Sequence, residues 1–140
     1  MRKIFLLFFT VGFLFAFGGK FLMPNEAFIP KVKLNKNMQI EVEIKIAKGI
    51  YLYEKKLKLR LKDSNDIEIK NIKKPKPILH DGEMVFFKTP HFLVTLANKD
   101  KTLEIKEIVF ELSYQGCSTA GLCYEPFTKI YNFKVDTSKL

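Results

Sequence analysis

Apolar and polar residues alternate along most of the chain after its first twenty positions. Between residues 38 and 46 the even positions are apolar, whereas Gln39, Glu41, Glu43 and Lys45 occupy the odd positions. Because successive side chains of a β-strand point to opposite faces, this pattern predicts a strand with one buried face. Similar patterns predict further strands over 50–53, 57–61, 67–72, 84–87, 92–96, 108–114 and 130–135.

Turn signals separate these segments. Gly49 follows the first predicted strand, a polar turn occupies 63–66, and the sequence KKPKP at 73–77 predicts an extended connection. The apolar positions change from odd to even near Lys106 and Glu107, which predicts a β-bulge or a turn there. No stretch after the first twenty residues has a helical apolar period. Seven to nine short strands in about 100 residues predict an all-β antiparallel sandwich.

The N-terminus has the features of an export signal. Basic residues at positions 2 and 3 precede an apolar run over 4–17, and Ala16 and Gly18 provide small residues at the spacing of a cleavage site. A membrane-spanning helix needs about 20 apolar residues, so the run favours a cleaved signal peptide over an uncleaved anchor. We therefore expect a signal peptide over 1–18, cleaved near Gly18, a single domain over 19–140, and a periplasmic location.

The formal net charge of the chain is +9, which raises the question of nucleic-acid binding. The lysines alternate with apolar residues along the predicted strands, as at Lys56 and Lys58, instead of forming one basic cluster. A solvated sheet face accounts for this spacing, and export argues against a nucleic-acid partner.

The two cysteines of the chain, Cys117 and Cys123, lie in the segment YQGCSTAGLCY at 114–124. Five residues separate them, including Gly121, which suits a hairpin loop that closes a disulfide. Three interpretations follow from the residues alone. The pair can be a stabilising disulfide, although so short a loop gains little from closure. It can bind metal, although His80 and His91 are remote in sequence, or it can exchange disulfides with partners.

Two blocks of sequence resemble a known family. The block YQGC, five residues, CYEPFTK at 114–129 and the block GIYLYEK at 49–55 resemble the N-terminal periplasmic domain of the thiol:disulfide interchange protein DsbD. The resemblance covers roughly 28–135. It implies an immunoglobulin-like fold with a redox-active hairpin, in which Cys123 forms the mixed disulfide with partners and Cys117 resolves it. It also implies that Tyr51 and Tyr53 lie beside the cysteines.

The resemblance also implies a function. A domain of this family relays electrons from a membrane-embedded thiol reductase with a thioredoxin-like domain to oxidised periplasmic proteins. Disulfide isomerases and the thioredoxin-like proteins of cytochrome c biogenesis are the expected acceptors. We therefore expect a protein-disulfide reductase activity without cofactor or metal, in a monomer that meets the membrane only through its partner. The chain ends at Leu140, so we expect the electrons to come from another chain.

The segment HDGEMVFF at 80–87 departs from the family pattern, which has a cap loop over the disulfide at this place. Met84 or Phe86 is the expected cap aromatic position, depending on a gap. Met84, Phe86 and Phe87 can equally be core residues of one strand. Asp81 and Glu83 are the expected acids, one of which would accept a proton during exchange. A rival function is a non-catalytic periplasmic binding or chaperone-like sandwich with a structural disulfide, because a sandwich fold alone does not determine function.

Overall fold

The computed structural model describes residues 21–140, so the predicted signal peptide lies outside the described residues. This part of the chain folds into β-strands with one short helix and two 3-10 turns. The elements are α1 (Pro24–Ala27), β1 (Phe28–Leu34), β2 (Ile40–Ile46), β3 (Ile50–Tyr53), η1 (Glu54–Lys56), β4 (Lys58–Lys62), β5 (Ile67–Lys73), β6 (Ile78–His80), β7 (Glu83–Phe86), β8 (His91–Asn98), β9 (Ile105–Tyr114), β10 (Gly116–Ser118), β11 (Phe127–Asp136) and η2 (Thr137–Lys139).

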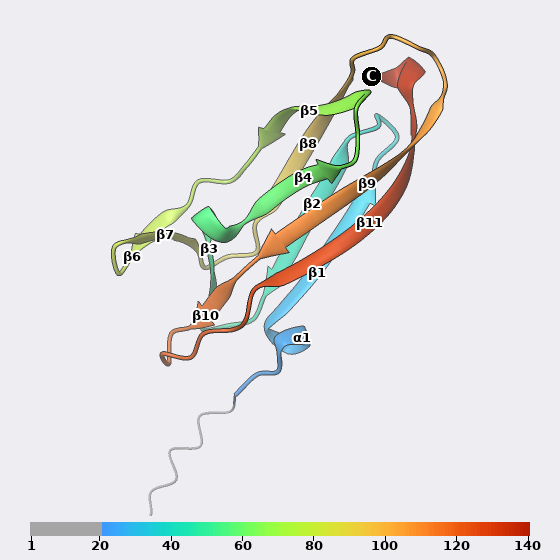
Figure 1. Cartoon of the computed structure of the whole chain (residues 1–140). Helices are drawn as coiled ribbons and strands as arrows, with labels where there is room; N and C mark the ends of the chain where they lie inside the picture. Colours follow the sequence, from blue (N-terminus) through green and yellow to red (C-terminus); the bar gives the residue numbers. More distant parts are fainter. Residues whose placement is uncertain (1–20) are drawn as a thin grey trace, which may run out of the picture.

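Two antiparallel sheets form the layers of a sandwich (Figure 1). One has the order β1-β2-β8-β5 and the other β11-β9-β4. The buried apolar side chains of both layers form a single core, which includes Ile40, Val42 and Ile44 of β2 and Phe110 and Leu112 of β9. The predicted immunoglobulin-like antiparallel sandwich is therefore confirmed. Within residues 21–140, no helix has the length and apolar character needed to cross a membrane.

A third sheet, with the order β10-β3-β7-β6, lies at one end of the sandwich (Figure 1). Its two faces have different neighbours, because side chains alternate along each strand. Leu52 of β3 and Phe86 of β7 belong to the main core. Tyr51 and Val85, on the opposite face, form a separate small cluster with Cys117. This second face carries the candidate site.

The change of the apolar positions from odd to even near Lys106 does not mark a bulge or a turn, so that prediction was wrong. Strand β9 runs without interruption from Ile105 to Tyr114 and pairs with β11 in one continuous register. The change arises because Leu103 and Ile105 are exposed apolar residues and do not belong to the buried face. A register irregularity occurs instead in β5, between Ile69 and Asn71.

Candidate redox site

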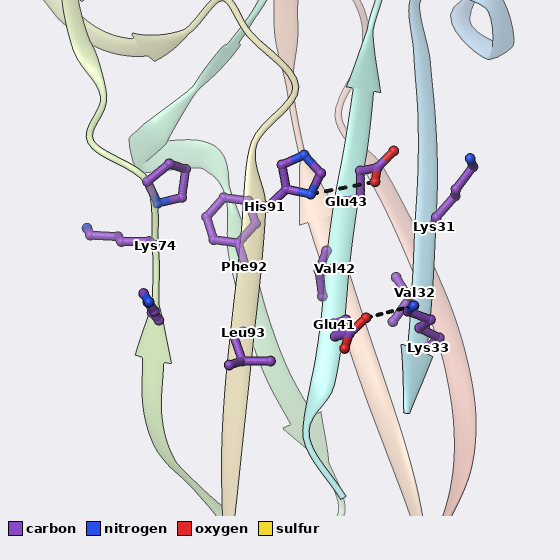
Figure 2. Close-up of a pocket in the computed structure, with 12 residues that line it drawn as sticks. Lys31, Val32, Lys33, Glu41, Val42, Glu43, Lys74, His91, Phe92 and Leu93 are labelled. Carbon is purple, nitrogen blue, oxygen red and sulfur yellow. Dashed lines mark ion pairs between the residues drawn. The ribbon is translucent and has the colours of Figure 1, made fainter. Parts of the chain in front are cut away.

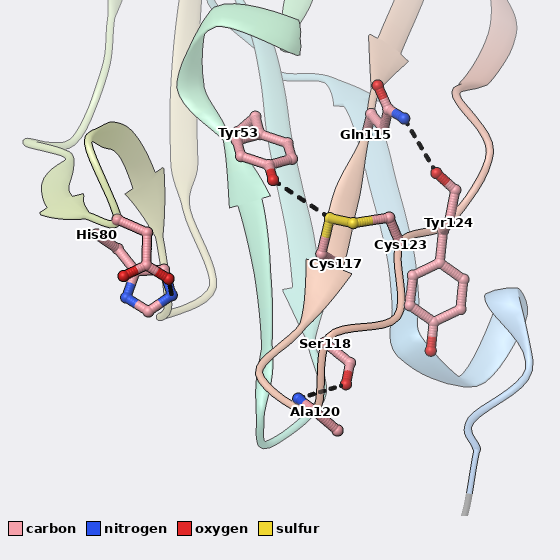
Figure 3. The surroundings of a disulfide bond; sticks show 9 residues. Tyr53, His80, Gln115, Cys117, Ser118, Ala120, Cys123 and Tyr124 are labelled. Atoms are coloured by element: carbon pink, nitrogen blue, oxygen red, sulfur yellow. Dashed lines mark hydrogen bonds and ion pairs between the residues drawn. A yellow bond between two sulfur atoms is a disulfide. The ribbon is translucent and has the colours of Figure 1, made fainter.

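Cys117 and Cys123 form a disulfide at the end of the molecule where the third sheet lies (Figure 3). Cys117 belongs to β10, and Cys123 lies in the loop that leads to β11. Their Cα atoms are 4.0 Å apart. The bond expected from the spacing of the two cysteines is therefore present.

Backbone hydrogen bonds fold the loop between the cysteines. The amide of Ser118 donates to the carbonyl of Leu122 over 2.7 Å, and the amide of Gly121 donates to the carbonyl of Ser118 over 3.0 Å. Gly121 has φ +92°, a conformation that glycine adopts at little cost. The Tyr124 amide donates to the Gly116 carbonyl over 3.0 Å. The loop is thus closed by its own main chain beside the disulfide.

Strand β10 packs tightly against β3 because its first residue is glycine. A Cβ atom at Gly116 would lie 2.0 Å from the Tyr51 carbonyl oxygen and 2.8 Å from Cζ of Phe28. Only a residue without a side chain fits there, and its neighbour Cys117 then pairs directly with Tyr51 across the two strands. The glycine of the YQGC motif thus brings the disulfide onto the face of the third sheet.

The two sulfur-bearing residues differ in their access to solvent. Cys117 is only 1% exposed, whereas Cys123 is exposed. Disulfide exchange begins with attack on an accessible sulfur atom. A partner thiolate can therefore approach Cys123 directly, while Cys117 is shielded.

Aromatic side chains cover Cys117. The Tyr53 hydroxyl donates a hydrogen bond to the Cys117 sulfur over 3.4 Å. The Tyr51 ring contacts Tyr53, His80 and Phe87 at centroid distances of 5.5, 5.0 and 5.3 Å. The structure thus brings both predicted tyrosines to the disulfide, together with His80 and Phe87. The sequence placed both residues in the segment 80–87 that aligns with the family's cap loop, but gave neither of them a role at the disulfide.

The environment of Tyr51 keeps its hydroxyl neutral. Burial, the neighbouring Tyr53 hydroxyl and the charge of Asp81 raise the pKa of Tyr51 to about 12. A neutral phenol beside the cysteines can donate a hydrogen bond to a sulfur anion but adds no negative charge of its own.

The predicted cap positions do not meet the disulfide. Phe86 is 4% exposed and packs edge-on against Phe92 in the main core. Met84 is 40% exposed and pairs with Leu79 across the β6–β7 hairpin. Both residues lie on the face of β7 opposite to Val85, since side chains alternate along a strand. Phe87, one position further, is the aromatic that reaches the cluster.

The two expected acids are engaged by other groups. The Asp81 carboxylate lies 3.2 Å from Nε2 of His80, and its side chain is 88% exposed. Glu83 forms an ion pair with Lys55. Among the hydrogen bonds of residues 21–140, neither carboxylate contacts a sulfur atom.

Other features of the described residues do not extend the site. No group of three or more His, Cys, Asp and Glu side chains within 21–140 is arranged to hold a metal ion. His91 lies away from the cysteines in an open groove of about 670 Å³ on β1, β2 and β8, where its Nδ1 is 3.5 Å from Glu43 (Figure 2). Basic side chains, including Lys31 and Lys74, line this groove. None of its lining residues belongs to the disulfide loop or to the aromatic cluster.

Two solved structures have a fold similar to that of this chain. The DsbD N-terminal domain of Neisseria meningitidis in its reduced form has a TM-score of 0.64 and 20% identity, covering 85% of this chain and 94% of that chain. The same domain in its complex with the PilB N-terminal domain has a TM-score of 0.63 and 21% identity, covering 81% and 87%. A comparison with curated protein sequences finds no match.

The family model described as "Thiol:disulfide interchange protein DsbD, N-terminal" matches residues 19–135. This range contains the third sheet, the aromatic cluster and both cysteines. The chain therefore belongs to the family of N-terminal domains of the thiol:disulfide interchange protein DsbD.

Proposed function

We propose that this domain relays electrons in the periplasm through reversible opening of the Cys117–Cys123 disulfide. The donor is a membrane-embedded thiol reductase with a thioredoxin-like domain. The acceptors are oxidised periplasmic proteins, including disulfide isomerases and the thioredoxin-like proteins of cytochrome c maturation. Membership of the DsbD family supports this proposal. So does the complex that a relative with the same fold forms with the PilB N-terminal domain.

Reduction of the domain proceeds in two exchange steps. A donor thiolate attacks Sγ of Cys123, the bond between the two cysteines breaks, and Cys117 leaves as a thiolate. The second donor thiol, after losing its proton, attacks the donor sulfur of this mixed disulfide. The donor is thereby oxidised and Cys123 is released. The domain has then gained two electrons and two protons, and its two cysteines are thiols.

Transfer to an acceptor runs in the opposite direction. The Cys123 thiolate attacks the acceptor disulfide, and the Cys117 thiolate then attacks Cys123 and expels the reduced acceptor. The observation that carries the proposal is the unequal exposure of the two residues, since Cys117 is buried and Cys123 is exposed. A partner can then form a disulfide only with Cys123. The resolving sulfur, that of Cys117, is buried next to it and hydrogen-bonded to Tyr53.

The reduction potential of the pair tests this proposal. The exported protein is equilibrated in glutathione buffers, its thiols are trapped, and the oxidised fraction is measured by mass spectrometry. We expect a potential of roughly −180 to −270 mV, the range of exchangeable disulfides. A potential below about −300 mV would identify a structural bridge and favour a non-catalytic binding module.

A trapping experiment tests the roles of the two sulfurs. The Cys117→Ser variant is mixed with a thioredoxin-like protein that keeps only its nucleophilic cysteine, activated as a mixed disulfide with thionitrobenzoate, and the covalent adduct is quantified on a non-reducing gel. We expect a stable mixed disulfide through Cys123, because neither protein keeps a second cysteine that can resolve it. Cys123→Ser is the matched control and forms little adduct, since its one thiol is buried. Equal adduct from both variants would refute the assigned roles.

We further propose that the acid which accepts a proton during exchange is Asp81. Its side chain is 88% exposed although it lies beside His80, whereas the Glu83 side chain is 39% exposed and is paired with Lys55. Asp81→Asn should slow transfer to a protein partner, and Glu83→Gln should have the smaller effect. Stopped-flow kinetics with both variants tests the assignment, which unchanged transfer in Asp81→Asn would exclude.

A further inference from the structure

Tyr124, the residue after Cys123, is held at several points. Its side chain is 5% exposed although the neighbouring cysteine is exposed. Its backbone amide donates to the Gly116 carbonyl over 3.0 Å, and its own carbonyl accepts from Nε2 of Gln115 over 3.1 Å. Both partners precede Cys117 in the chain. Tyr124 therefore connects the backbone that follows Cys123 to the backbone that precedes Cys117 (Figure 3).

The N-terminal segment 21–27, called the strap below, holds the Tyr124 side chain. The Tyr124 hydroxyl donates to the Leu22 carbonyl over 2.9 Å. The Phe21 ring stacks on the Tyr124 ring at 5.6 Å, and Phe28, which directly follows the strap, meets it edge-on at 5.2 Å. Figure 1 shows the strap, with α1, at the same end of the molecule as β10.

The strap is itself fixed to the fold. Ala27 is fully buried in the main core, and its carbonyl accepts from the Ala47 amide over 3.0 Å. The Glu26 and Ala27 amides both donate to the Met23 carbonyl over 2.9 Å. Burial, with a smaller contribution from the charge of Glu26, raises the pKa of Tyr124, so its hydroxyl remains a donor at neutral pH. Tyr124 thus has a rigid support on the side away from the disulfide.

We propose that Tyr124 is a positioning residue for the redox reaction, and that the strap 21–27 supports it so that Cys123 stays beside Cys117 when the disulfide is open. Two thiols held close together re-form their bond more readily, because less chain entropy is lost on closure. Tyr124 and the strap therefore favour the disulfide over the dithiol. The inference rests on the proposed function only in that the bond must open reversibly.

The equilibrium constant for reduction of the Cys117–Cys123 disulfide by glutathione tests this role. In this reaction two molecules of glutathione are oxidised for each disulfide that opens. Tyr124→Phe removes only the bond to Leu22, and we expect the constant for reduction to rise about threefold, as for one lost neutral hydrogen bond. Tyr124→Ala frees the backbone, and we expect a rise of about tenfold, comparable to ordering one residue. Phe21→Ala should act in the same direction through the strap.

Tyr131→Phe is the matched control, since it removes a hydroxyl from a tyrosine stacked on Phe133 in β11 and not on the loop. Circular dichroism first establishes that each variant is folded in both redox states. Lower thermal stability with an unchanged equilibrium constant in Tyr124→Phe and Phe21→Ala would overturn the proposal, because a merely structural residue affects both redox states equally. If glutathione fails to reduce the wild type, the proposed function fails. The same comparison in dithiothreitol then still tests Tyr124.

Discussion

The Tyr53 hydroxyl donates a hydrogen bond to the buried sulfur of Cys117 over 3.4 Å. In the disulfide this contact is weak, because sulfur is a poor acceptor. Once Cys117 becomes a thiolate, the same hydroxyl faces a full negative charge, and hydrogen bonds to charged groups are stronger. Tyr53 therefore matters most in the step in which Cys117 leaves or attacks.

Removing this hydroxyl should slow the resolving step. In Tyr53→Phe the Cys117 thiolate loses its donor while the ring and its packing remain, so we expect resolution of a Cys123 mixed disulfide to slow by about tenfold. The rate is measured on the mixed disulfide of Cys123 with glutathione. Mass spectrometry monitors the release of glutathione over a range of pH. Higher pH should recover part of the loss, because it supplies thiolate. Tyr131→Phe is the control, and an equal loss in both variants would contradict a local role for Tyr53.

Phe87 should shield the disulfide, and Met84 should not. Phe87 lies on the same face as Cys117 and contacts the Tyr51 ring at 5.3 Å, whereas Met84 lies on the opposite face of β7. We expect Phe87→Ala to accelerate reduction by dithiothreitol severalfold, since a small reductant then also gains access to the shielded sulfur of Cys117. Met84→Ala is the matched control with little change. Faster reduction in Met84→Ala alone would assign the cap to Met84.

Gly116 should be essential for the pairing of β10 with β3. Its missing Cβ would lie 2.0 Å from the Tyr51 carbonyl, so Gly116→Ala must push the strands apart. We expect a loss of about 2–3 kcal/mol in the free energy of unfolding. Gly82→Ala is the control: nothing lies within 4 Å of its Cβ position, and its φ of +78° costs only about 1 kcal/mol of strain. Urea denaturation compares the two, and an equal or smaller loss in Gly116→Ala would contradict the close approach.

Tyr51 should ionise at unusually high pH. Its pKa is raised to about 12, first by burial and then by Tyr53 and Asp81. The folded state therefore prefers the neutral phenol. Its contribution to stability is complete below the ordinary value of about 10 and is lost as pH rises through about 12. The tyrosinate absorbance of the wild type minus that of Tyr51→Phe follows this residue alone. A difference transition near pH 10 would show that Tyr51 is not shielded.

Sequence alternation predicted the sandwich well because most strands have one buried face. It missed β1, where Pro30 and alternating lysines resemble a connection, and it missed β6 and β10, which have three residues each. The cysteine spacing and the two motif blocks located the disulfide and its tyrosines. The cap could not be placed, because neither Met84 nor Phe86 is on the face that meets the disulfide, and a step of one residue along a strand exchanges its two faces. Phe86 and Phe87 differ by that single step.

The alternation of β3 has a consequence for how this protein can evolve. Ile50 and Leu52 belong to the main core, while Tyr51 and Tyr53, interleaved with them, lie beside the buried residue Cys117. Neighbouring codons thus encode two traits that selection can alter separately. Relatives can vary in the reduction potential of the disulfide through the positions of Tyr51 and Tyr53, while the positions of Ile50 and Leu52 keep the sandwich intact.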